Sequence, residues 1–341
     1  MIKIGDKIIG GESTFIIADI GSNHMQDLSI AKKTVLAAVE AGVDAVKFQS
    51  IQLDSLYHKP DSETEKFIKQ LEFPEFWHKE LNDYCKTLKV PFFSSPTYLE
   101  SIDILEEINV PLYKIASAQI GVFPQLVDRV ASLNKPTIFS TGIVNNEELD
   151  AIVNVFEKHQ NEKFIILHCN SIYPTPPDKV NLPMIGHYLK KYPNQPIGFS
   201  DHTVGTHIAK AAVALGANVI EKHFTLDKNF DAPDSNEFAC DPKEMELLCK
   251  EIREIEFARA KYSNRRFIEP QEKQFKNVIQ YRCLAKKSLK AGELVKEQDF
   301  YYLRAENGLT ATDLKKSLKA RLYYANNIKH KQLLRREDIQ W

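Results

Sequence analysis

The sequence predicts an α/β fold: a (β/α)8 TIM barrel followed by a small β-rich domain. Three observations lead to this fold class. Eight short apolar runs alternate with helical patterns over about 250 residues, which favours a barrel, with an open doubly wound sheet as the alternative. Each run ends in polar residues. After Tyr262 the alternation stops, and a polar stretch and an internal repeat follow.

The eight predicted strands are short runs rich in apolar and β-branched residues, which favours a strand over a buried helix. In chain order they are FIIADIG (15–21), VDAVKFQ (43–49), VPFFSS (90–95), LYKIAS (112–117), TIFSTG (137–142), FIILHCN (164–170), PIGFSDH (196–202) and VIEKHF (219–224).

Amphipathic segments between these runs predict the helices. In the segment 27–41, Asp27 can cap a helix, and one face collects apolar residues at helical spacing, namely Leu28, Ala31, Val35 and Ala38. Gly42 and Gly216 each stand between a helical pattern and the next strand, where a glycine commonly ends a helix.

The chain is predicted to divide into a barrel (1–262), a polar linker (263–281) and the small domain (282–341). Within the small domain, SLKAGELVKEQDF (288–300) matches NIKHKQLLRREDI (327–339). The two copies begin 39 residues apart, at 288 and 327. Such a repeat implies a pseudo-symmetric, β-rich fold.

Composition excludes several classes of protein. The formal net charge is −1, from 45 basic and 46 acidic residues, so no overall field favours nucleic acid or an anionic membrane. The 5 cysteines are odd in number and form no CxxC pair, which indicates reduced thiols rather than a disulfide framework. No signal-peptide core or membrane-length apolar run is present, so we expect a soluble, cytoplasmic protein.

Polar side chains gather at the carboxyl end of every predicted strand, and in a (β/α)8 barrel these ends build the active site. Because strand residues two apart share a face, Glu221 lies on the side of His223, and Ser200 on the side of His202. Two imidazoles on neighbouring strands suit a catalytic divalent ion, with Glu221 as a ligand or an orienting group. His168 is a third candidate ligand. Ordinary structural histidines are the alternative.

Two lysines stand among these strand ends. Lys47 and Lys114 end the second and fourth strands, near the hydroxyl groups of Ser95, Ser117 and Ser140. Ammonium and hydroxyl groups together suit a phosphate or carboxylate ligand. Lysines that merely extend their charge to solvent are one alternative. A Schiff-base lysine of a class I aldolase is another, but the histidines weigh against it because an imine needs no metal.

Seven motifs stand in order along nearly the whole chain: IIADIGSNH (16–24), AGVDAVKFQ (41–49), YKIAS (113–117), STG (140–142), HCNSIYPTP (168–176), GFSDHTVG (198–205) and EKHFTLDKNFDAPD (221–234). Together they resemble the sialic acid synthase (N-acetylneuraminate synthase) family, which includes the legionaminic and pseudaminic acid synthases. The C-terminal repeat resembles the antifreeze-like (SAF) domain of that family.

The resemblance implies a divalent metal ion, Mn²⁺ in the first place with Mg²⁺ or Co²⁺ as alternatives. It also implies a domain-swapped homodimer, in which the antifreeze-like domain covers the barrel of the partner. By matching position, His202 and His223 correspond to the metal ligands. The implied phosphoenolpyruvate contacts are Lys47, Ser95, Lys114, Ser117, Ser140 and Ser200. The implied amino sugar contacts are Gln49, Tyr173, Asp234 and, at the acyl group, Arg304.

The implied reaction joins phosphoenolpyruvate to an N-acylated amino sugar and gives a nonulosonic (sialic-type) acid and phosphate. The metal polarises the aldehyde of the open-chain sugar, which the phosphoenolpyruvate methylene attacks. Water then adds at the enol carbon, and phosphate leaves with C–O cleavage. The lysines hold the phosphate, and Asp19 is the candidate for proton transfer.

Several positions depart from the family pattern. Asp19 stands where Glu is usual, so its carboxylate must reach further or act through water. Thr97 replaces a usual Phe. Gln119 replaces a usual Glu and Ser171 an Asn of some members, and both remain candidate substrate contacts. After Arg304, Ala-Glu-Asn-Gly replaces a Pro-rich turn. The changes cluster on the acceptor side.

Other functions remain open at this point: a related phosphoenolpyruvate-dependent synthase acting on a phosphorylated sugar, a pyruvate aldolase, or a non-catalytic, regulatory sugar-binding barrel. Asp19 and Gln119 allow the last. His202, His223 and the two lysines argue against it, because a binder has no use for metal and phosphate groups together. The sequence does not distinguish N-acetylmannosamine from a 2,4-diacetamido-6-deoxy sugar as the acceptor.

Overall fold

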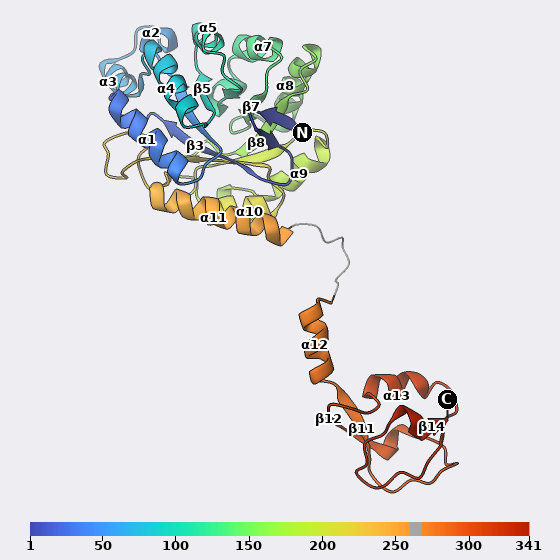
Figure 1. Ribbon diagram of the computed structural model, residues 1–341. Helices are drawn as coiled ribbons and strands as arrows, with labels where there is room; N and C mark the ends of the chain where they lie inside the picture. Colours follow the sequence, from blue (N-terminus) through green and yellow to red (C-terminus); the bar gives the residue numbers. More distant parts are fainter. Residues whose placement is uncertain (260–267, 341) are drawn as a thin grey trace. The chain divides into compact units, whose positions relative to one another are not determined.

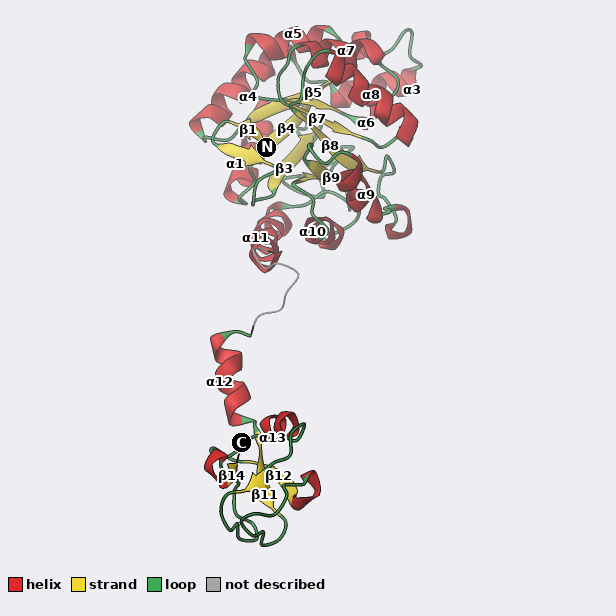
Figure 2. Ribbon diagram, turned by 90° about the vertical axis from the view of Figure 1, so that its right-hand side faces the viewer, coloured by secondary structure: helices red, strands yellow, loops and turns green. Residues whose placement is uncertain are grey.

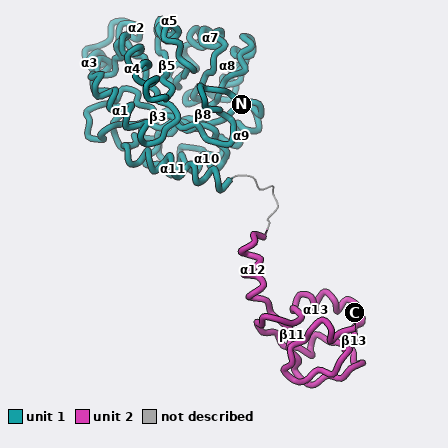
Figure 3. Tube along the Cα trace, in the orientation of Figure 1, with its two compact units in different colours: residues 1–261 teal, residues 262–341 magenta. Residues whose placement is uncertain are grey.

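The computed structural model describes residues 1–259 and 268–340. The chain forms two compact units, Met1–Lys261 and Tyr262–Trp341 (Figure 3). In the described residues, no helix is both long enough and apolar enough to cross a membrane.

Eight parallel strands form the centre of the first unit (Figure 1), and all eight were predicted. They are β3 (Phe15–Gly21), β4 (Ala45–Ser50), β5 (Phe92–Pro96), β6 (Tyr113–Ile115), β7 (Thr137–Ser140), β8 (Phe164–Cys169), β9 (Ile197–Asp201) and β10 (Val219–His223). Their order is β5-β4-β3-β10-β9-β8-β7-β6, so the last strand pairs with the first. With β5 and β6 side by side at the seam, the sheet is a nearly closed barrel, which confirms the predicted fold class.

Helices surround this barrel (Figure 2). They are α1 (Leu28–Glu40), α2 (Leu53–Leu56), α3 (Ser62–Leu71), α4 (Glu75–Thr87), α5 (Glu100–Glu107), α6 (Ser117–Ile120), α7 (Pro124–Ser132), α8 (Asn146–Lys158), α9 (Pro183–Lys191), α10 (His207–Ala214), α11 (Pro242–Arg259) and the short 3₁₀ turn η1 (Pro177–Lys179). The features predicted for α1 are present. Asp27 accepts hydrogen bonds from the backbone N–H groups of Ser29 and Ile30, and Gly42 has a φ of +93°.

An N-terminal hairpin precedes the barrel and was not predicted. It consists of β1 (Ile2–Ile4) and β2 (Lys7–Ile9), which pair antiparallel. Ile2, Ile4 and Ile9 are buried in the same apolar cluster as the residues that begin the barrel strands, such as Phe15 and Val219. The hairpin therefore closes the amino-terminal end of the barrel, and each buried isoleucine contributes about 1.5–3 kcal/mol.

The second unit is small and built from short antiparallel pairs. Its elements are α12 (Pro270–Val278), β11 (Tyr281–Ala285), η2 (Glu297–Asp299), β12 (Phe300–Arg304), α13 (Ala311–Ser317), β13 (Tyr323–Tyr324), η3 (Arg336–Asp338) and β14 (Ile339–Gln340). The predicted polar linker, 263–281, lies partly outside the described residues. Its described part contains α12, which starts at Pro270, a favourable first helical residue.

The internal repeat is visible as repeated geometry. Asp299 accepts a hydrogen bond from the Lys296 N–H at 3.1 Å, and 39 positions later Asp338 accepts one from the Arg335 N–H at 2.8 Å. Both aspartates end equivalent 3₁₀ turns, η2 and η3. The two copies also meet directly, because Leu289 and Ile328 form an antiparallel bridge.

The interior of the barrel leaves no space for a side chain at Gly198 in β9. A Cβ there would lie 2.5 Å from Leu167 Cδ2 and 2.6 Å from the Val219 carbonyl oxygen. We expect Gly198→Ala to destabilise the protein by about 1–3 kcal/mol, because neighbouring strands must shift.

Gly186 in α9 is the matched control, since a Cβ there meets nothing within 4 Å. Gly186→Ala should stabilise the protein by about 0.5–1 kcal/mol through its better helix propensity. Urea unfolding measures both variants. A Gly198→Ala protein as stable as the wild type would contradict the close packing.

Candidate active site

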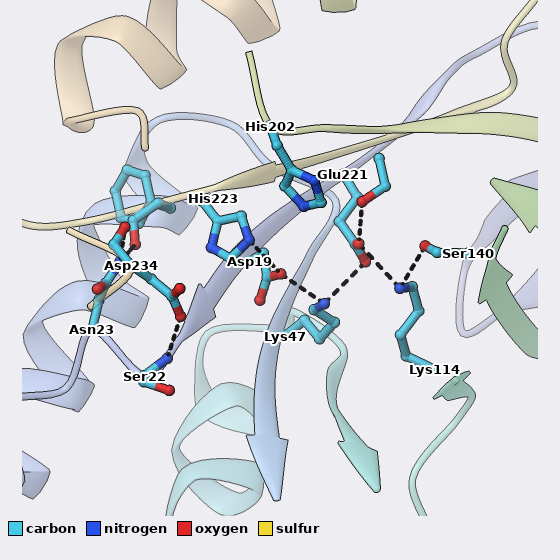
Figure 4. Close-up of polar contacts among 12 residues, drawn as sticks. Asp19, Ser22, Asn23, Lys47, Lys114, Ser140, His202, Glu221, His223 and Asp234 are labelled. Carbon is cyan, nitrogen blue, oxygen red and sulfur yellow. Dashed lines mark hydrogen bonds and ion pairs between the residues drawn. The ribbon is translucent and has the colours of Figure 1, made fainter. Parts of the chain in front are cut away.

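The carboxyl ends of the strands bring charged side chains into one buried cluster (Figure 4). Alternation along each strand turns these side chains inwards. They are Asp19 of β3, Lys47 of β4, Lys114 of β6, Glu221 and His223 of β10, and His202 directly after β9. None of the six residues is more than 5% exposed.

Four of these side chains alternate in charge. Lys47 Nζ lies 2.7 Å from Asp19 Oδ2 and 3.3 Å from Glu221 Oε2. Lys114 Nζ lies 3.2 Å from Glu221 Oε1, and it donates to Ser140 Oγ at 2.8 Å. An unpaired buried charge is strongly destabilising, so each of these ions depends on its oppositely charged neighbours.

The pairing sets the protonation states. Burial would lower the pKa of Lys47, but Asp19 and Glu221 raise it above its usual range. Burial would raise the pKa of Glu221, but Lys114 and Lys47 hold it below its usual range. Burial raises the pKa of Asp19 against the opposing effect of Lys47, and burial lowers the pKa of Lys114 although Glu221 opposes this. Each ammonium has three donors, so both lysines keep a donor for a ligand.

The two histidines lie next to each other and are neutral. Their ring centroids are 5.3 Å apart. Burial, with His223 nearby, lowers the pKa of His202 to about 3, and burial lowers the pKa of His223 to about 4. His202 Nδ1 donates to the Asn170 carbonyl at 2.8 Å, which leaves its Nε2 lone pair available. His223 Nε2 lies 3.5 Å from Asp19 Oδ2, a polar contact when the imidazole is uncharged.

These histidines fit a divalent metal ion. Neutral imidazoles are suitable ligands, and the buried Nδ1 of His223 has no hydrogen-bond partner among the described residues. Across residues 1–259 and 268–340, no three or more His, Cys, Asp or Glu side chains are grouped to hold a metal. The protein therefore offers His202 and His223 as donors, and water or substrate would complete the coordination.

Glu221 was predicted as a metal ligand or an orienting group for the histidines. The structure surrounds its carboxylate with the two lysines and with Ser200, which donates to Oε1 at 2.8 Å. The carboxylate that contacts His223 belongs to Asp19. Glu221 thus links the lysines to each other, and Asp19 links them to the histidines.

Further polar atoms at this end of the barrel are buried without a hydrogen-bond partner in the described part of the chain. They are Asp19 Oδ1, Ser95 Oγ, Gln119 Oε1 and Ser171 Oγ. Buried polar atoms are nearly always paired in folded proteins, so this group indicates a surface built for a polar ligand. Gly142 lies against two hydroxyl groups, since a Cβ there would overlap Ser171 Oγ and Ser117 Oγ.

The predicted acceptor-side residues Gln49 and Asp234 come together with Asp19 around Gly21. A Cβ at Gly21, whose φ is +53°, would lie 2.7 Å from Asp234 Oδ2, 3.4 Å from Gln49 Nε2 and 3.5 Å from Asp19 Oδ1. Asn23 holds this arrangement by donating to the Asp234 carbonyl at 3.1 Å. Its role was not predicted, although it stands in the quoted motif IIADIGSNH.

Tyr173, a predicted amino sugar contact, packs against His202, and its contact with the sugar stays a prediction. Its ring centroid is 4.2 Å from that of His202, and both rings pack against Phe238, whose role was not predicted. Arg304 ends β12 of the second unit, with its guanidinium 5.6 Å from the ring centroid of Tyr281. Its contact with the acceptor stays a prediction.

The expectation for His168 is wrong. Its Nε2 donates to the Val180 carbonyl at 2.6 Å, on the outer face of β8, and so the ring faces away from His202 and His223. The next residue, Cys169, faces inwards and accepts a hydrogen bond from Ser117 Oγ at 3.4 Å. The inward direction of Cys169 could have been predicted from the sequence. Leu167 belongs to the inner apolar cluster, and strand residues two apart share a face.

Thr97 is one of the departures from the family pattern, and its side chain bonds the backbone of β4. Its Oγ1 donates to the Ser50 carbonyl at 2.6 Å. Ser50 also bonds Ser94 Oγ and His78 Nε2, each at 2.8 Å, and these side chains are buried. This network joins the ends of β4 and β5, next to the inward-facing Ser95.

Known proteins share this arrangement of sequence and fold. The model of the NeuB family matches residues 34–264. The chain belongs to the NeuB family. It is 37% identical to N,N'-diacetyllegionaminic acid synthase of Campylobacter jejuni over 315 residues, 88% of this chain and 93% of that protein. It is 35% identical to human N-acetylneuraminate-9-phosphate synthase over 265 residues, 73% of this chain and 72% of that protein.

A solved structure of a NeuB-type enzyme has the same fold. The N-acetylneuraminic acid (sialic acid) synthetase of Leptospira borgpetersenii, in complex with citrate, aligns with a TM-score of 0.75 at 32% identity, over 81% of this chain and 96% of that one. The predicted membership in the sialic acid synthase family is confirmed. The chain is a phosphoenolpyruvate-dependent nonulosonic acid synthase, and NeuB enzymes are generally metal-dependent.

The hydroxyl groups around Gly142 provide a test of the phosphoenolpyruvate side. Gly142→Ala places a methyl group against Ser117 and Ser171, with Ser117 Cβ only 2.7 Å away. Because these hydroxyls must turn away, we expect the KM for phosphoenolpyruvate to rise by about tenfold, the effect of 1.4 kcal/mol of lost binding. Steady-state kinetics measures this, and thermal unfolding should stay within a few degrees of wild type. An unchanged KM for phosphoenolpyruvate would contradict the predicted contact between Ser117 and this substrate.

Proposed function

We propose that this NeuB-family enzyme condenses phosphoenolpyruvate with the open-chain form of an N-acylated amino sugar, with metal assistance and cleavage of the C–O bond of phosphoenolpyruvate. One observation carries the proposal. The carboxylate of Asp19 joins the two halves of the buried cluster, a cationic half with Lys47 and Lys114 and a half with the neutral imidazoles of His202 and His223.

The lysine half suits phosphoenolpyruvate, which carries a phosphate and a carboxylate. Lys47 and Lys114 supply charge together with free N–H donors, and the nearby hydroxyl groups of Ser95 and Ser117 supply neutral donors. Glu221 pairs with both lysines and so holds their ammonium groups in place before substrate arrives. Preorganised charge of this kind needs no rearrangement when the anion binds.

The histidine half suits the acceptor aldehyde. A metal ion held by His202 and His223 supplies a Lewis acid for the aldehyde oxygen. Asp19 contacts both His223 and Lys47, so its carboxyl group is placed to move a proton between the two halves. Burial raises its pKa, which favours this role. Gln49 and Asp234 line the same side for the sugar.

The bond changes balance as follows. The methylene carbon of phosphoenolpyruvate bonds to the aldehyde carbon of the sugar, and the aldehyde oxygen takes up a proton. Water adds to the former enol carbon and releases a proton. The bond between that carbon and the phosphate ester oxygen then breaks, and the new hydroxyl group gives up its proton to the departing phosphate, which leaves the 2-keto acid.

The contacts favour this chemistry over a Schiff-base aldolase. An imine requires a neutral amine, and the carboxylates of Asp19 and Glu221 hold Lys47 as a cation. Burial does lower the pKa of Lys114, yet Glu221 lies 3.2 Å from its ammonium group. Mn²⁺ is the proposed ion, with Mg²⁺ or Co²⁺ as alternatives. A cytoplasmic location stays a prediction.

The proposal predicts turnover of phosphoenolpyruvate with an N-acylated amino sugar in the presence of Mn²⁺. The panel of acceptors includes N-acetylmannosamine and 2,4-diacetamido-6-deoxy sugars. Mass spectrometry should show one acceptor gaining a three-carbon unit while phosphate is released. With ¹⁸O in the bridging ester oxygen, the label should appear in phosphate. Label in the sugar acid would contradict C–O cleavage.

The same assay tests the metal. His202→Ala or His223→Ala should abolish metal-dependent turnover, because each removes a ligand, while circular dichroism shows an intact fold. A chelator should stop the wild-type reaction, and added Mn²⁺ should restore it. Full activity in either variant would contradict the assignment of these histidines as metal ligands.

The mouth of the barrel carries an apolar rim, which supports the predicted swapped dimer. Among the described residues, exposed apolar side chains occur in the loops after seven successive barrel strands: Met25, Tyr57, Leu99, Val122, Ile143, Tyr173 and Val204. Scattered exposed apolar residues are normal, but these seven all belong to loops at the carboxyl end of the barrel, as expected if a partner covers that end. We propose that the antifreeze-like unit of a partner subunit covers this rim and brings Arg304 to the acceptor.

A complementation experiment distinguishes a swapped dimer from other arrangements. Arg304→Ala should raise the KM for the acceptor and leave the KM for phosphoenolpyruvate unchanged. At an acceptor concentration well below KM, where Arg304→Ala alone has little activity, co-expression with His202→Ala should recover about a quarter of wild-type activity, because half of the dimers are mixed and one of their two sites is intact. Activity no higher than the mean of the separate variants would exclude the swap.

A further inference from the structure

A second ion pair lies directly behind the histidines, and the condensation has no direct use for it. Lys222 Nζ is 3.0 Å from Asp201 Oδ2, and both side chains are 0% exposed. The two residues are register partners on β10 and β9. Because neighbouring strand residues face opposite sides, the pair faces outward while His202 and His223 face inward. Each member of the pair immediately precedes a histidine.

The pair also ties down the backbone around His202. Lys222 Nζ donates to the Thr203 carbonyl, and the Thr203 N–H donates to Asp201 Oδ1 at 2.8 Å. The register between β9 and β10 ends at Asp201 and Lys222, so His202 lies just beyond the last paired residue of β9. Side-chain contacts of the pair therefore fix a segment that the strand ladder no longer holds.

The end of β10, which carries His223, is held by backbone contacts. The Cys240 N–H donates to the His223 carbonyl at 2.7 Å, and Phe224 and Cys240 form a parallel bridge. His223 is thus fixed by backbone contacts.

His202 also has contacts of its own, since its carbonyl accepts from the Thr175 N–H at 2.9 Å and its Nδ1 donates to the Asn170 carbonyl at 2.8 Å. These contacts lead to the loop after β8, whereas Lys222 ties the segment 201–203 to β10, the strand that carries His223, and so contributes to the separation of the two imidazoles.

Stability alone does not require this ion pair. Two charges lose their hydration when they are buried, and a well-packed apolar pair of similar size is often at least as stable. The charged pair instead fixes the positions of its neighbours, because one ammonium group can donate to a carboxylate and to a carbonyl at once.

We propose that Asp201 and Lys222 are positioning residues, which set the separation of His202 and His223 for the metal ion. The inference rests on the proposed function, since the metal belongs to it. The pair touches neither substrate nor the reacting atoms. It acts through the histidines, as outer partners of metal ligands commonly do.

The double variant Asp201→Asn/Lys222→Met tests this role, because it leaves no unpaired charge and preserves volume. The control is Asp44→Asn/Arg253→Met, at the opposite end of the barrel just before β4. It removes the Asp44–Arg253 pair of 2.7 Å together with the pairs that these residues form with Lys7 and Glu256, so it is at least as disruptive as the test variant. Mn²⁺ binding is measured without substrate by electron paramagnetic resonance. We expect the Mn²⁺ Kd of the Asp201/Lys222 double variant to rise by about 10–100-fold. The control should bind Mn²⁺ like the wild type.

Kinetics provides a second readout. Excess Mn²⁺ should restore most of the turnover of the double variant, with the KM for phosphoenolpyruvate within about twofold of wild type, because the pair does not contact Lys47 or Lys114. Lys222→Met alone should unfold at a lower temperature than the double variant, since it leaves a buried carboxylate unpaired. If the double variant does not fold, Lys222→Arg carries the binding test, because it keeps Asp201 paired with a cation while it changes the reach to the Thr203 carbonyl, and it should weaken Mn²⁺ binding in the same direction.

The outcomes separate the inference from the proposed function. Unchanged Mn²⁺ affinity in the double variant, or an equal loss in the control, overturns the positioning role while the proposed function stands. A wild-type enzyme that binds no Mn²⁺ overturns the metal in the proposed function and the positioning role with it.

Discussion

The structure depends most on the row of alternating charges Asp19, Lys47, Glu221 and Lys114. Its members come from four strands that are widely separated in the sequence. Glu221 reaches both lysines only because β10 pairs with β3 and so closes the sheet. Barrel closure and the assembly of the site are therefore the same event, and a barrel that fails to close leaves at least one ion unpaired in an apolar surrounding.

On β9 and β10, the inward-facing and outward-facing residues have different roles. On β10 the inward residues Glu221 and His223 belong to the chemistry, and the outward Lys222 anchors the neighbouring strand end. β9 repeats this division with Ser200 inside and Asp201 outside. A period of two residues thus places reacting groups and their supports in adjacent positions of one short segment.

Much of the fold and the site followed from the sequence, and the misses have physical reasons. Strand position and the inward direction of His202 and His223 follow from local apolar runs and a period of two. His168 was misplaced because the phase of that strand is set by Leu167, which faces the inner core. Which inward carboxylate meets a histidine depends on how neighbouring strands are staggered, and this stagger is not visible in one strand's pattern. The N-terminal hairpin was missed because strands of 3 residues show almost no period.

The repeat in the second unit indicates how this unit arose. Both copies form the same 3₁₀ turn, the same aspartate hydrogen bond and one half of the bridge between Leu289 and Ile328. Each half therefore completes the other, as two identical subunits do across a twofold axis. This points to an ancestral segment of half the size that assembled as a pair, and to a later duplication that joined the two copies into one polypeptide. Once joined, the halves were free to diverge: the same left-handed backbone position is occupied by Gly292 in one copy and by Lys331 in the other.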